Sequence, residues 1–271
     1  NMMAVSGSNG QIRVGIGGWT FEPWRGLFFP KGTPKARELE YASRQVTSIE
    51  INGTYYATQK PATFRKWAAE TPDNFVFAVK ANRFATNRRV LAEAKPSIDM
   101  FLNSGLSELK QKLGPILWQF APTKKFDADD FAGFLALLPK KLGGLTLRHA
   151  LEVRHESFAV PEFVALARKH NAAIVYAHHE TYPEIADVTS DFVYARLQQT
   201  AAKVDTGYST ADIKRWAQRA KEWEAGKSPK GLPTFGKASK PVKTDVFVYF
   251  ISGAKERNPA AARALLKELK A

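Results

Sequence analysis

The chain has 271 residues, of which 44% are hydrophobic and 24% are charged, and it contains no cysteine. This composition is typical of a globular protein. The absence of cysteine excludes disulfides, thiolate nucleophiles and cysteine-ligated metal centres. Lysine and arginine number 40 against 26 acidic residues, which gives a formal net charge of +14. Such a charge favours anionic partners, either nucleic acids or small phosphorylated or acidic molecules.

The N-terminal residues 1–8 lack the apolar core of a signal peptide, and Asn1 ahead of Met2 indicates a cloning remnant. We expect residues 1–11 to be disordered or derived from cloning, and residues 12–271 to form one domain. Since no apolar run approaches the ~20 residues that span a bilayer, we expect a cytoplasmic protein with no membrane contact.

Eight short β-type runs recur along the chain, most of them separated by helical patterns. Each run is rich in β-branched or aromatic residues, as in strands that are buried on both faces. The predicted strands are residues 12–17, 46–52, 75–80, 115–120, 150–154, 172–177, 191–197 and 245–251.

Helical patterns fill most of the intervening stretches, and Pro61, Pro161 and Pro259 suit the first turn of a helix. The predicted helices are residues 34–44, 61–70, 95–113, 128–140, 161–170, 211–224 and 259–269. Residues 181–188 are too short and too proline-broken for a helix. Eight alternating units predict an α/β fold, a single (β/α)8 TIM barrel of eight parallel strands. An open doubly wound sheet is the alternative, but no glycine-rich phosphate-binding fingerprint supports it.

The segment 226–244 differs in composition from the rest of the chain, with five lysines, three prolines, three glycines and no acid. This composition predicts a long flexible loop. Because the segment connects a helix to the following strand, we expect it at the end of the barrel opposite the usual active site.

Polar residues gather near the C-terminal ends of the predicted strands, where barrel active sites lie. Side chains alternate along a strand, and Ile49 and Ile51 must face the helices, so Glu50 and Asn52 should point toward the barrel axis. The same alternation predicts inward positions for Lys80, Gln119, Glu152, Arg154, His178, Tyr194 and Arg196.

These side chains predict a site for a small anionic ligand. Glu50 and Glu152 are the candidate acid/base pair. Three cations would hold a phosphate or carboxylate, and three further polar residues would contact the ligand. The cations are Lys80, Arg154 and Arg196, and the further contacts are Asn52, Gln119 and His178. The alternative without function is an internal salt-bridge network that seals the barrel mouth.

A metal site is a competing interpretation, with Glu50, Glu152, His155, His178 and His179 as its candidate ligands. Metal sites in barrels gather acids and histidines from many strand ends, whereas three of these strands end in lysine, glutamine and arginine. We therefore expect neither a bound metal nor a cofactor, and any enzyme activity would be that of a metal-independent hydrolase, lyase or isomerase.

Aromatic residues crowd the loops after the first two strands. One interpretation is a stacking platform for a sugar or base near Arg25, with Trp19 and Tyr56 as ligand contacts. The alternative is a hydrophobic lid packed on the first helix.

Several sequence blocks together resemble the YecE-like family (domain of unknown function family seventy-two). They are residues 12–18 with Trp19, Trp24-Arg25-Gly26 and Phe28-Phe29-Pro30, then Glu50-Ile51-Asn52-Gly53-Thr54-Tyr55-Tyr56, Phe77-Ala78-Val79-Lys80-Ala81, Leu113-Gly114-Pro115-Ile116-Leu117, Leu151-Glu152-Val153-Arg154-His155-Glu156-Ser157, and Tyr194-Ala195-Arg196-Leu197. The resemblance spans nearly the whole chain. It implies a TIM barrel akin to the sugar-isomerase and apurinic-endonuclease barrels, and no assigned activity.

The chain departs from this family at polar positions. Asn87 follows Thr86 where the family has histidine, Gln198-Gln199 replace a His-Gly pair, and Ser252-Gly253-Ala254 replace an Asn-Asn-Asp-like triplet. The loss of two histidines and an acid weakens any metal-assisted or histidine-catalysed mechanism. Three hypotheses stay open: a barrel that binds a small anion and acts on it, a nucleic-acid-binding or nucleic-acid-processing protein, and a diverged, non-catalytic member with a sealed mouth.

Overall fold

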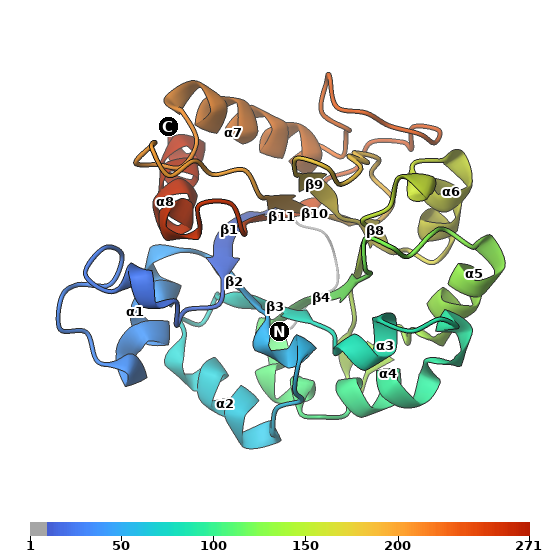
Figure 1. Ribbon diagram of the computed structural model, residues 1–271, viewed down its shortest axis with the longest axis horizontal. Helices are drawn as coiled ribbons and strands as arrows, with labels where there is room; N and C mark the ends of the chain where they lie inside the picture. Colours follow the sequence, from blue (N-terminus) through green and yellow to red (C-terminus); the bar gives the residue numbers. More distant parts are fainter. Residues whose placement is uncertain (1–9) are drawn as a thin grey trace.

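A computed structural model describes residues 10–271 as a barrel of parallel strands surrounded by helices (Figure 1). Most of the predicted N-terminal remnant, residues 1–9, lies outside the described residues. Gln11 belongs to the barrel, because its backbone N–H donates to Asp245 Oδ1 at 3.0 Å and its carbonyl accepts from Val246 N at 2.8 Å. The barrel's hydrogen bonding therefore begins one residue before the predicted boundary.

The main sheet has nine parallel strand segments in the order β8-β7-β4-β3-β2-β1-β11-β10-β9. The strands are β1 (Ile12–Gly17), β2 (Ser48–Ile51), β3 (Val76–Lys80), β4 (Leu113–Gln119), β7 (His149–Glu152), β8 (Ala173–Ile174), β9 (Tyr176–His178), β10 (Phe192–Leu197) and β11 (Asp245–Phe250). β8 pairs with β7 and β9 pairs with β10. The sixth predicted strand is thus divided at Val175, and the sheet closes nearly completely around it. The predicted TIM barrel is confirmed.

Eight α-helices within residues 10–271 lie around the barrel. They are α1 (Glu38–Gln45), α2 (Pro61–Glu70), α3 (Arg83–Thr86), α4 (Lys95–Leu102), α5 (Ala128–Leu137), α6 (Pro161–Lys169), α7 (Thr210–Glu224) and α8 (Asn258–Lys270). The predicted helix 95–113 is divided: α4 ends at Leu102, and Gly105, with a φ of 131°, separates it from a 3-10 helix over Leu106–Lys112. A short antiparallel hairpin, β5 (Lys141–Leu142) with β6 (Leu145–Thr146), was absent from the sequence-based prediction.

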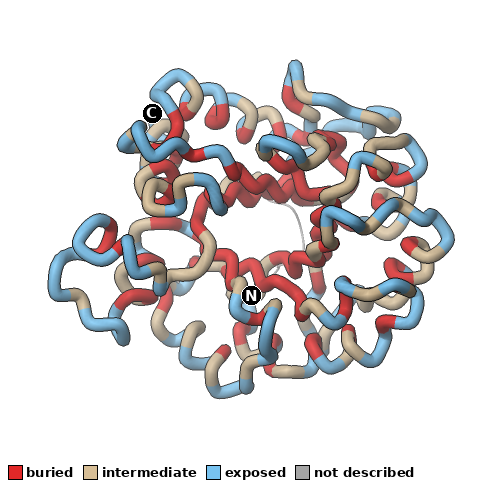
Figure 2. Tube along the Cα trace, viewed as in Figure 1, coloured by how far each residue is buried: buried red, intermediate tan, exposed pale blue. Residues whose placement is uncertain are grey.

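Two apolar layers stabilise the barrel. The outer layer fills the space between strands and helices and includes Ile49, Ile51 and Leu151, as the alternation predicts. The inner layer fills the barrel axis with Ala78, Leu117, Ala150, Ala173, Val175, Phe192, Tyr194, Phe247, Tyr249 and Ile251. Figure 2 shows the ring of buried strands around this axis. A TIM barrel of this kind is a packed core and not a pore.

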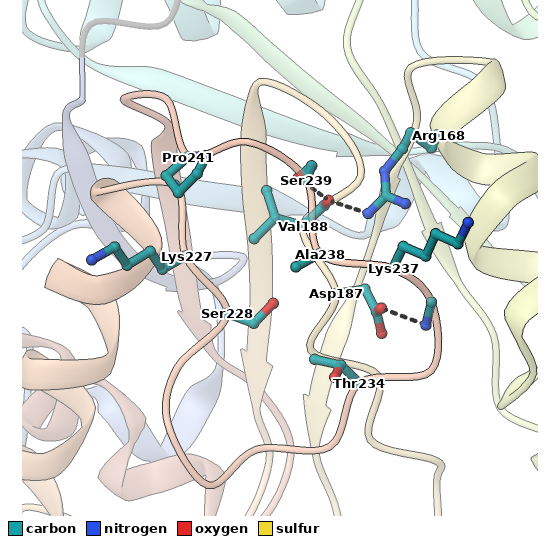
Figure 3. A pocket seen from close by; sticks show the side chains of 12 residues that line it. Arg168, Asp187, Val188, Lys227, Ser228, Thr234, Lys237, Ala238, Ser239 and Pro241 are labelled. Atoms are coloured by element: carbon teal, nitrogen blue, oxygen red, sulfur yellow. Dashed lines mark hydrogen bonds between the residues drawn. The ribbon is translucent and has the colours of Figure 1, made fainter.

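The described chain between β9 and β10 contains no helix. The segment 226–244 instead lies in the outer layer between α6 and α7 (Figure 1). It has neither helix nor strand, but Asp187 accepts hydrogen bonds from Phe235 N and Gly236 N, both at 2.9 Å, and Phe235 packs on the core. A hollow of about 240 Å³ lies beneath it (Figure 3), where Arg168 donates to the Val188 carbonyl at 3.0 Å. These contacts differ from those of the freely moving loop that the composition predicts.

No helix within residues 10–271 is long and apolar enough to span a membrane.

Candidate functional site

Arg196 lies at the centre of a charged cluster at the C-terminal end of the barrel. Its Nε donates to Glu50 Oε1 at 3.0 Å and its Nη2 donates to Glu50 Oε2 at 2.9 Å, which forms a bidentate pair. Its Nη1 donates to Glu152 Oε2 at 2.8 Å. All three side chains are buried. Strand alternation directs them to the barrel axis from β2, β7 and β10, so residues that are 146 positions apart in sequence meet there.

The two carboxylates are ionised despite their burial. Burial by itself raises the pKa of Glu50, but the charge and hydrogen bonds of Arg196, with smaller contributions from Lys80 and Tyr194, lower it to about 2. The Tyr194 hydroxyl donates to Glu50 Oε1. For Glu152 the same opposition holds, with burial raising the pKa and Arg196 and Arg154 lowering it below its ordinary value. Both side chains therefore act as fixed negative charges at neutral pH.

Arg154 continues the cluster toward solvent. Its Nη2 donates to Glu152 Oε2 at 3.2 Å and to Gln119 Oε1 at 3.0 Å, and its Nη1 donates to Tyr182 Oη at 3.1 Å. The guanidinium also lies 4.6 Å from the centre of the Tyr182 ring, a cation–π geometry. Arg154 has 16% of its side chain exposed, so it is the arginine of the cluster that a ligand can reach.

Lys80 differs from the other charged residues of the cluster. It is only 9% exposed, yet its ammonium forms no hydrogen bond or ion pair with any described residue. Its Nζ lies 5.5 Å from the centre of the Tyr55 ring. Burial and then the positive charge of Arg196 lower the pKa of Lys80 to about 8, against opposing contributions from Glu50 and Glu152. The cluster thus holds three cations and two carboxylates, and the uncompensated positive charge is that of Lys80.

Two amide side chains that follow barrel strands have buried atoms without partners in the described part of the chain. These atoms are Oδ1 of Asn52, just after β2, and Nε2 of Gln198, just after β10. Buried polar groups are nearly always hydrogen-bonded in native proteins. An unsatisfied acceptor and an unsatisfied donor at the ends of two barrel strands are therefore available to a ligand.

His178 lies elsewhere, and its predicted inward position is wrong. Its Nδ1 is 2.9 Å from Tyr208 Oη and its ring centre is 5.0 Å from that of Trp216 on α7. The inward positions of this strand belong to Ala173 and Val175. The large rings of β10 and β11 already fill the axis, so this strand contributes small side chains to it and its own large rings face the helix layer.

Of the predicted aromatic platform, Trp19 and Arg25 lie apart from the cluster, whereas the ring of Tyr56 packs against that of Tyr55, which adjoins Lys80, with ring centres 5.1 Å apart. Trp19 packs against Trp67 with ring centres 5.2 Å apart, and Arg25 pairs with Glu38 at 3.3 Å. Tyr56 is 73% exposed. None of the contacts of these three residues within residues 10–271 joins them to Glu50, Glu152 or Arg196, and the first two belong to the packing around the first loop.

Three residues that contact or adjoin the cluster were not predicted as ligand contacts, although His179 was named as a candidate metal ligand. Tyr55 lies beside Lys80 and Tyr182 lies beside Arg154, while His179 stacks on Tyr182 with ring centres 3.5 Å apart. Tyr55 follows Asn52 by three residues, so its place near a strand end was a usable signal. Tyr182 lies in a loop that carries no periodic pattern.

No group of three or more histidine, aspartate or glutamate side chains within the described range could hold a metal ion. The expectation that the chain binds no metal stays a prediction, which elemental analysis of protein purified without chelator would check.

Comparisons with known proteins agree with the fold. Residues 13–271 match the family described as "Protein of unknown function DUF72". UPF0759 protein YunF of Bacillus subtilis (strain 168) is 26% identical over 163 residues, which cover 56% of this chain and 54% of YunF. The match thus spans about half the length of this relative.

Two solved structures of DUF72 family proteins have a similar fold. The protein from Thermotoga maritima MSB8 is 21% identical with a TM-score of 0.71, and the alignment covers 96% of this chain and 100% of the other. The protein from Enterococcus faecalis V583 is 18% identical with a TM-score of 0.71, and 96% of each chain is covered. This chain belongs to the DUF72 family of proteins of unknown function, which is the YecE-like family that its sequence blocks resemble.

Proposed function

We propose that this barrel binds a small anionic ligand at the C-terminal end of its strands, with Lys80 as the principal cation. The observation that carries the proposal is the ammonium of Lys80, which has no hydrogen bond or ion pair among the described residues, on a side chain that is only 9% exposed and whose charge is partly desolvated. Burying an unpaired charge is costly, and an anionic ligand would remove that cost.

The alternative of a sealed structural network accounts for only part of the cluster. Arg196 compensates Glu50 fully and shares Glu152 with Arg154. A network that served only to fill the barrel end would have no need of a third cation, and an apolar residue at position 80 would be less costly there. Lys80 is thus the residue that favours a ligand over a seal.

The structure motivates a change in the roles expected of each residue. Arg196 is already bound by two carboxylates, so we assign it to positioning Glu50 and Glu152 and not to holding the ligand. The lowered pKa values of these two carboxyls suit them poorly to donating a proton at neutral pH. With a pKa of about 8, Lys80 is the group in the cluster that can exchange a proton near neutral pH. Arg154 is the second ligand contact.

Titration of Lys80 by NMR tests the proposal directly. The ε-carbon resonance of Lys80, assigned by comparison with Lys80→Met, should titrate near the pKa of about 8 in the free protein. Addition of a saturating carboxylate or phosphate probe, such as malonate or inorganic phosphate, should raise this pKa by at least one unit, because a bound anion favours the ammonium. A pKa that does not move with any anion of such a panel would contradict the proposal.

Calorimetry with matched variants gives an independent test. Lys80→Met should weaken binding of the same probe at least tenfold, whereas Lys267→Met, at an exposed position on α8, should leave it unchanged. Equal affinities of the two variants would mean that the anion binds elsewhere.

Nucleic-acid binding is a second candidate function. The observation in its favour is that all five lysines of segment 226–244 are exposed. We propose that this contact is weak, independent of base sequence and separate from the charged cluster.

A further inference from the structure

A basic hollow lies between the loops that follow β3 and β4, the strands that end in Lys80 and Gln119. It has a volume of about 530 Å³ and is lined by Thr86, Asn87, Arg88, Arg89, Ala121, Thr123, Lys124 and Lys125. Small-molecule sites have volumes of about 300–1,000 Å³. The lining residues include four cations and no acid, and among them Lys124 has an acidic partner in the described chain, Asp130 at 4.0 Å, so the hollow combines the size of a ligand site with a net positive charge.

The four cations are not equivalent. Lys124 Nζ donates to the carbonyls of Arg88 and Arg89 at 3.2 and 2.8 Å, so it ties the two loops together. Arg88 donates to the Phe84 carbonyl at 3.3 Å. The exposed side chains of Arg89 and Lys125 have no hydrogen bond or ion pair within the described chain. Two cations therefore shape the hollow, and two are free to bind a ligand.

Thr86 supplies a second, independent observation. It is the last residue of α3, is 1% exposed and lines the hollow, and its Oγ1 is buried with no partner in the described structure. A hydroxyl can donate one hydrogen bond and accept two. A buried hydroxyl without a partner is unusual, and a ligand oxygen in the hollow would provide one.

We propose that this hollow is a binding site for the phosphate group of a small phosphorylated ligand. The Thr86 hydroxyl would donate to one phosphate oxygen, and Arg89 and Lys125 would neutralise the charge of the others. We favour a small ligand over a polynucleotide because the cations converge in a hollow of limited volume. The proposal does not depend on Lys80 and concerns a site separate from the charged cluster.

Calorimetry and phosphorus NMR test this site with three probes: inorganic phosphate, a mononucleotide and a single-stranded oligonucleotide. The double variant Arg89→Gln/Lys125→Gln should weaken binding of the mononucleotide at least tenfold. Thr86→Val, which keeps the side-chain shape, should weaken it several-fold. A matched control is Lys214→Gln/Lys221→Gln, which removes two exposed charges from α7 on the opposite side of the barrel (Figure 1).

Either of two outcomes would overturn the proposal. The first is that the Arg89→Gln/Lys125→Gln and Thr86→Val variants, like the control, bind the mononucleotide as tightly as the wild type does. The second is tight oligonucleotide binding with no measurable binding of phosphate or mononucleotide, which would mean a nucleic-acid surface. The Lys80 titration should remain unaltered in the hollow variants, so failure of this proposal and failure of the Lys80 proposal are distinguishable.

Discussion

Protonated Lys80 lowers the stability of the folded protein, whereas the apolar residues of the barrel core raise it. Its pKa of about 8 in the folded protein lies below its ordinary value of 10.5. Protonation therefore opposes folding. The cost of protonated Lys80 to the free energy of unfolding is fully present below pH 8, declines as the pH rises from 8 to 10.5, and is absent above pH 10.5. Stability lost at one buried charge is a common cost of a binding site.

We therefore predict that Lys80→Met stabilises the protein at pH 7, by about 1–3 kcal/mol on the scale of 1.36 kcal/mol for each pKa unit. The gain should shrink as the pH rises toward 10.5. Urea unfolding of the wild type and the variant at several pH values measures the difference. A variant less stable than the wild type at pH 7 would mean that Lys80 has a structural partner in solution.

Arg196 has the opposite effect on stability from Lys80, because its charge compensates the buried carboxylates of Glu50 and Glu152. Arg196→Met leaves Glu50 and Glu152 buried without their main counter-ion. Removing one partner of a buried pair typically costs about 3–5 kcal/mol, and we expect a loss of that order in urea unfolding. The control is Arg37→Met, because Arg37 pairs with Glu40 at the surface and such pairs are worth about 0–1 kcal/mol.

Adding Glu50→Gln to the Arg196→Met variant removes one of the two stranded charges and should recover part of the loss. An Arg196→Met protein that is destabilised no more than the Arg37→Met control would refute the central role of this cluster in folding.

At the scale of elements, Asp187 holds segment 226–244 on the barrel. Its carboxylate accepts two backbone N–H groups of the segment, and hydrogen bonds to charged groups contribute about 1.5–3 kcal/mol each. Gly226 allows a second close approach, because a Cβ there would lie 2.0 Å from the Val242 carbonyl oxygen. The segment thus covers a side of the barrel that has no crossover helix.

Asp187→Ala should release this segment while the barrel stays folded. Four of the five lysines of the segment are trypsin sites, because trypsin does not cleave between Lys240 and Pro241, so we expect cleavage within residues 226–244 to become at least tenfold faster under native conditions. Asp205→Ala, at a side chain that is 98% exposed, is the control. Equal cleavage rates for the two variants would show that other contacts hold the segment.

His149 joins β4, β7 and the turn before the hairpin. Its Nδ1 accepts from Trp118 Nε1 at 3.0 Å and its Nε2 is 2.7 Å from the Pro139 carbonyl. Indole N–H can only donate, so the imidazole is neutral with its proton on Nε2. Burial lowers the pKa of His149 to about 4 from its ordinary 6.5.

The unfolded chain therefore takes up a proton at His149 before the folded chain does, and stability should fall as the pH drops from 6.5 toward 4. We expect His149→Gln to lose this part of the pH dependence, of about 1–3 kcal/mol, in urea unfolding between pH 7 and 4. A pH profile identical to that of the wild type would show that His149 does not titrate as the structure implies.

At the scale of the whole molecule, the net charge of +14 makes some nucleic-acid binding expected. Affinity for duplex DNA falls with a slope of about −0.9 in log K against log salt for each phosphate neutralised. If segment 226–244 makes the contact, changing its five lysines to glutamine should abolish binding and flatten this slope. Fluorescence anisotropy over a salt series measures both quantities.

The matched control changes five exposed lysines outside the segment to glutamine: Lys141, Lys169, Lys214, Lys221 and Lys267. An equal loss in both variants would mean that net charge alone governs binding. Tight binding that persists at high salt and disappears in an Arg154 or Arg196 variant would instead place nucleic acid at the charged cluster.

Local patterns in the sequence determine the barrel and much of the charged cluster. Alternation around Ile49 and Ile51 directs Glu50 inward, and alternation around Leu151 does the same for Glu152, because an apolar side chain must face the helix layer. The repeating strand and helix units then predict closure, and the C-terminal strand ends predict where polar side chains meet. These inferences depend on periodicity over a few residues, which a single sequence contains in full.

Pairing and packing were decided only by the tertiary structure. Alternation defines two faces of the sixth strand but not which one is inward. His178 faces α7 because the large rings of β10 and β11 fill the axis and leave space there only for small residues of that strand. Composition could not show that segment 226–244 packs on Asp187. The sequence determined that three cations and two carboxylates would gather at one end. Only the geometry, in which Arg196 takes up both carboxylates, decided that Lys80 is left as the unpaired charge.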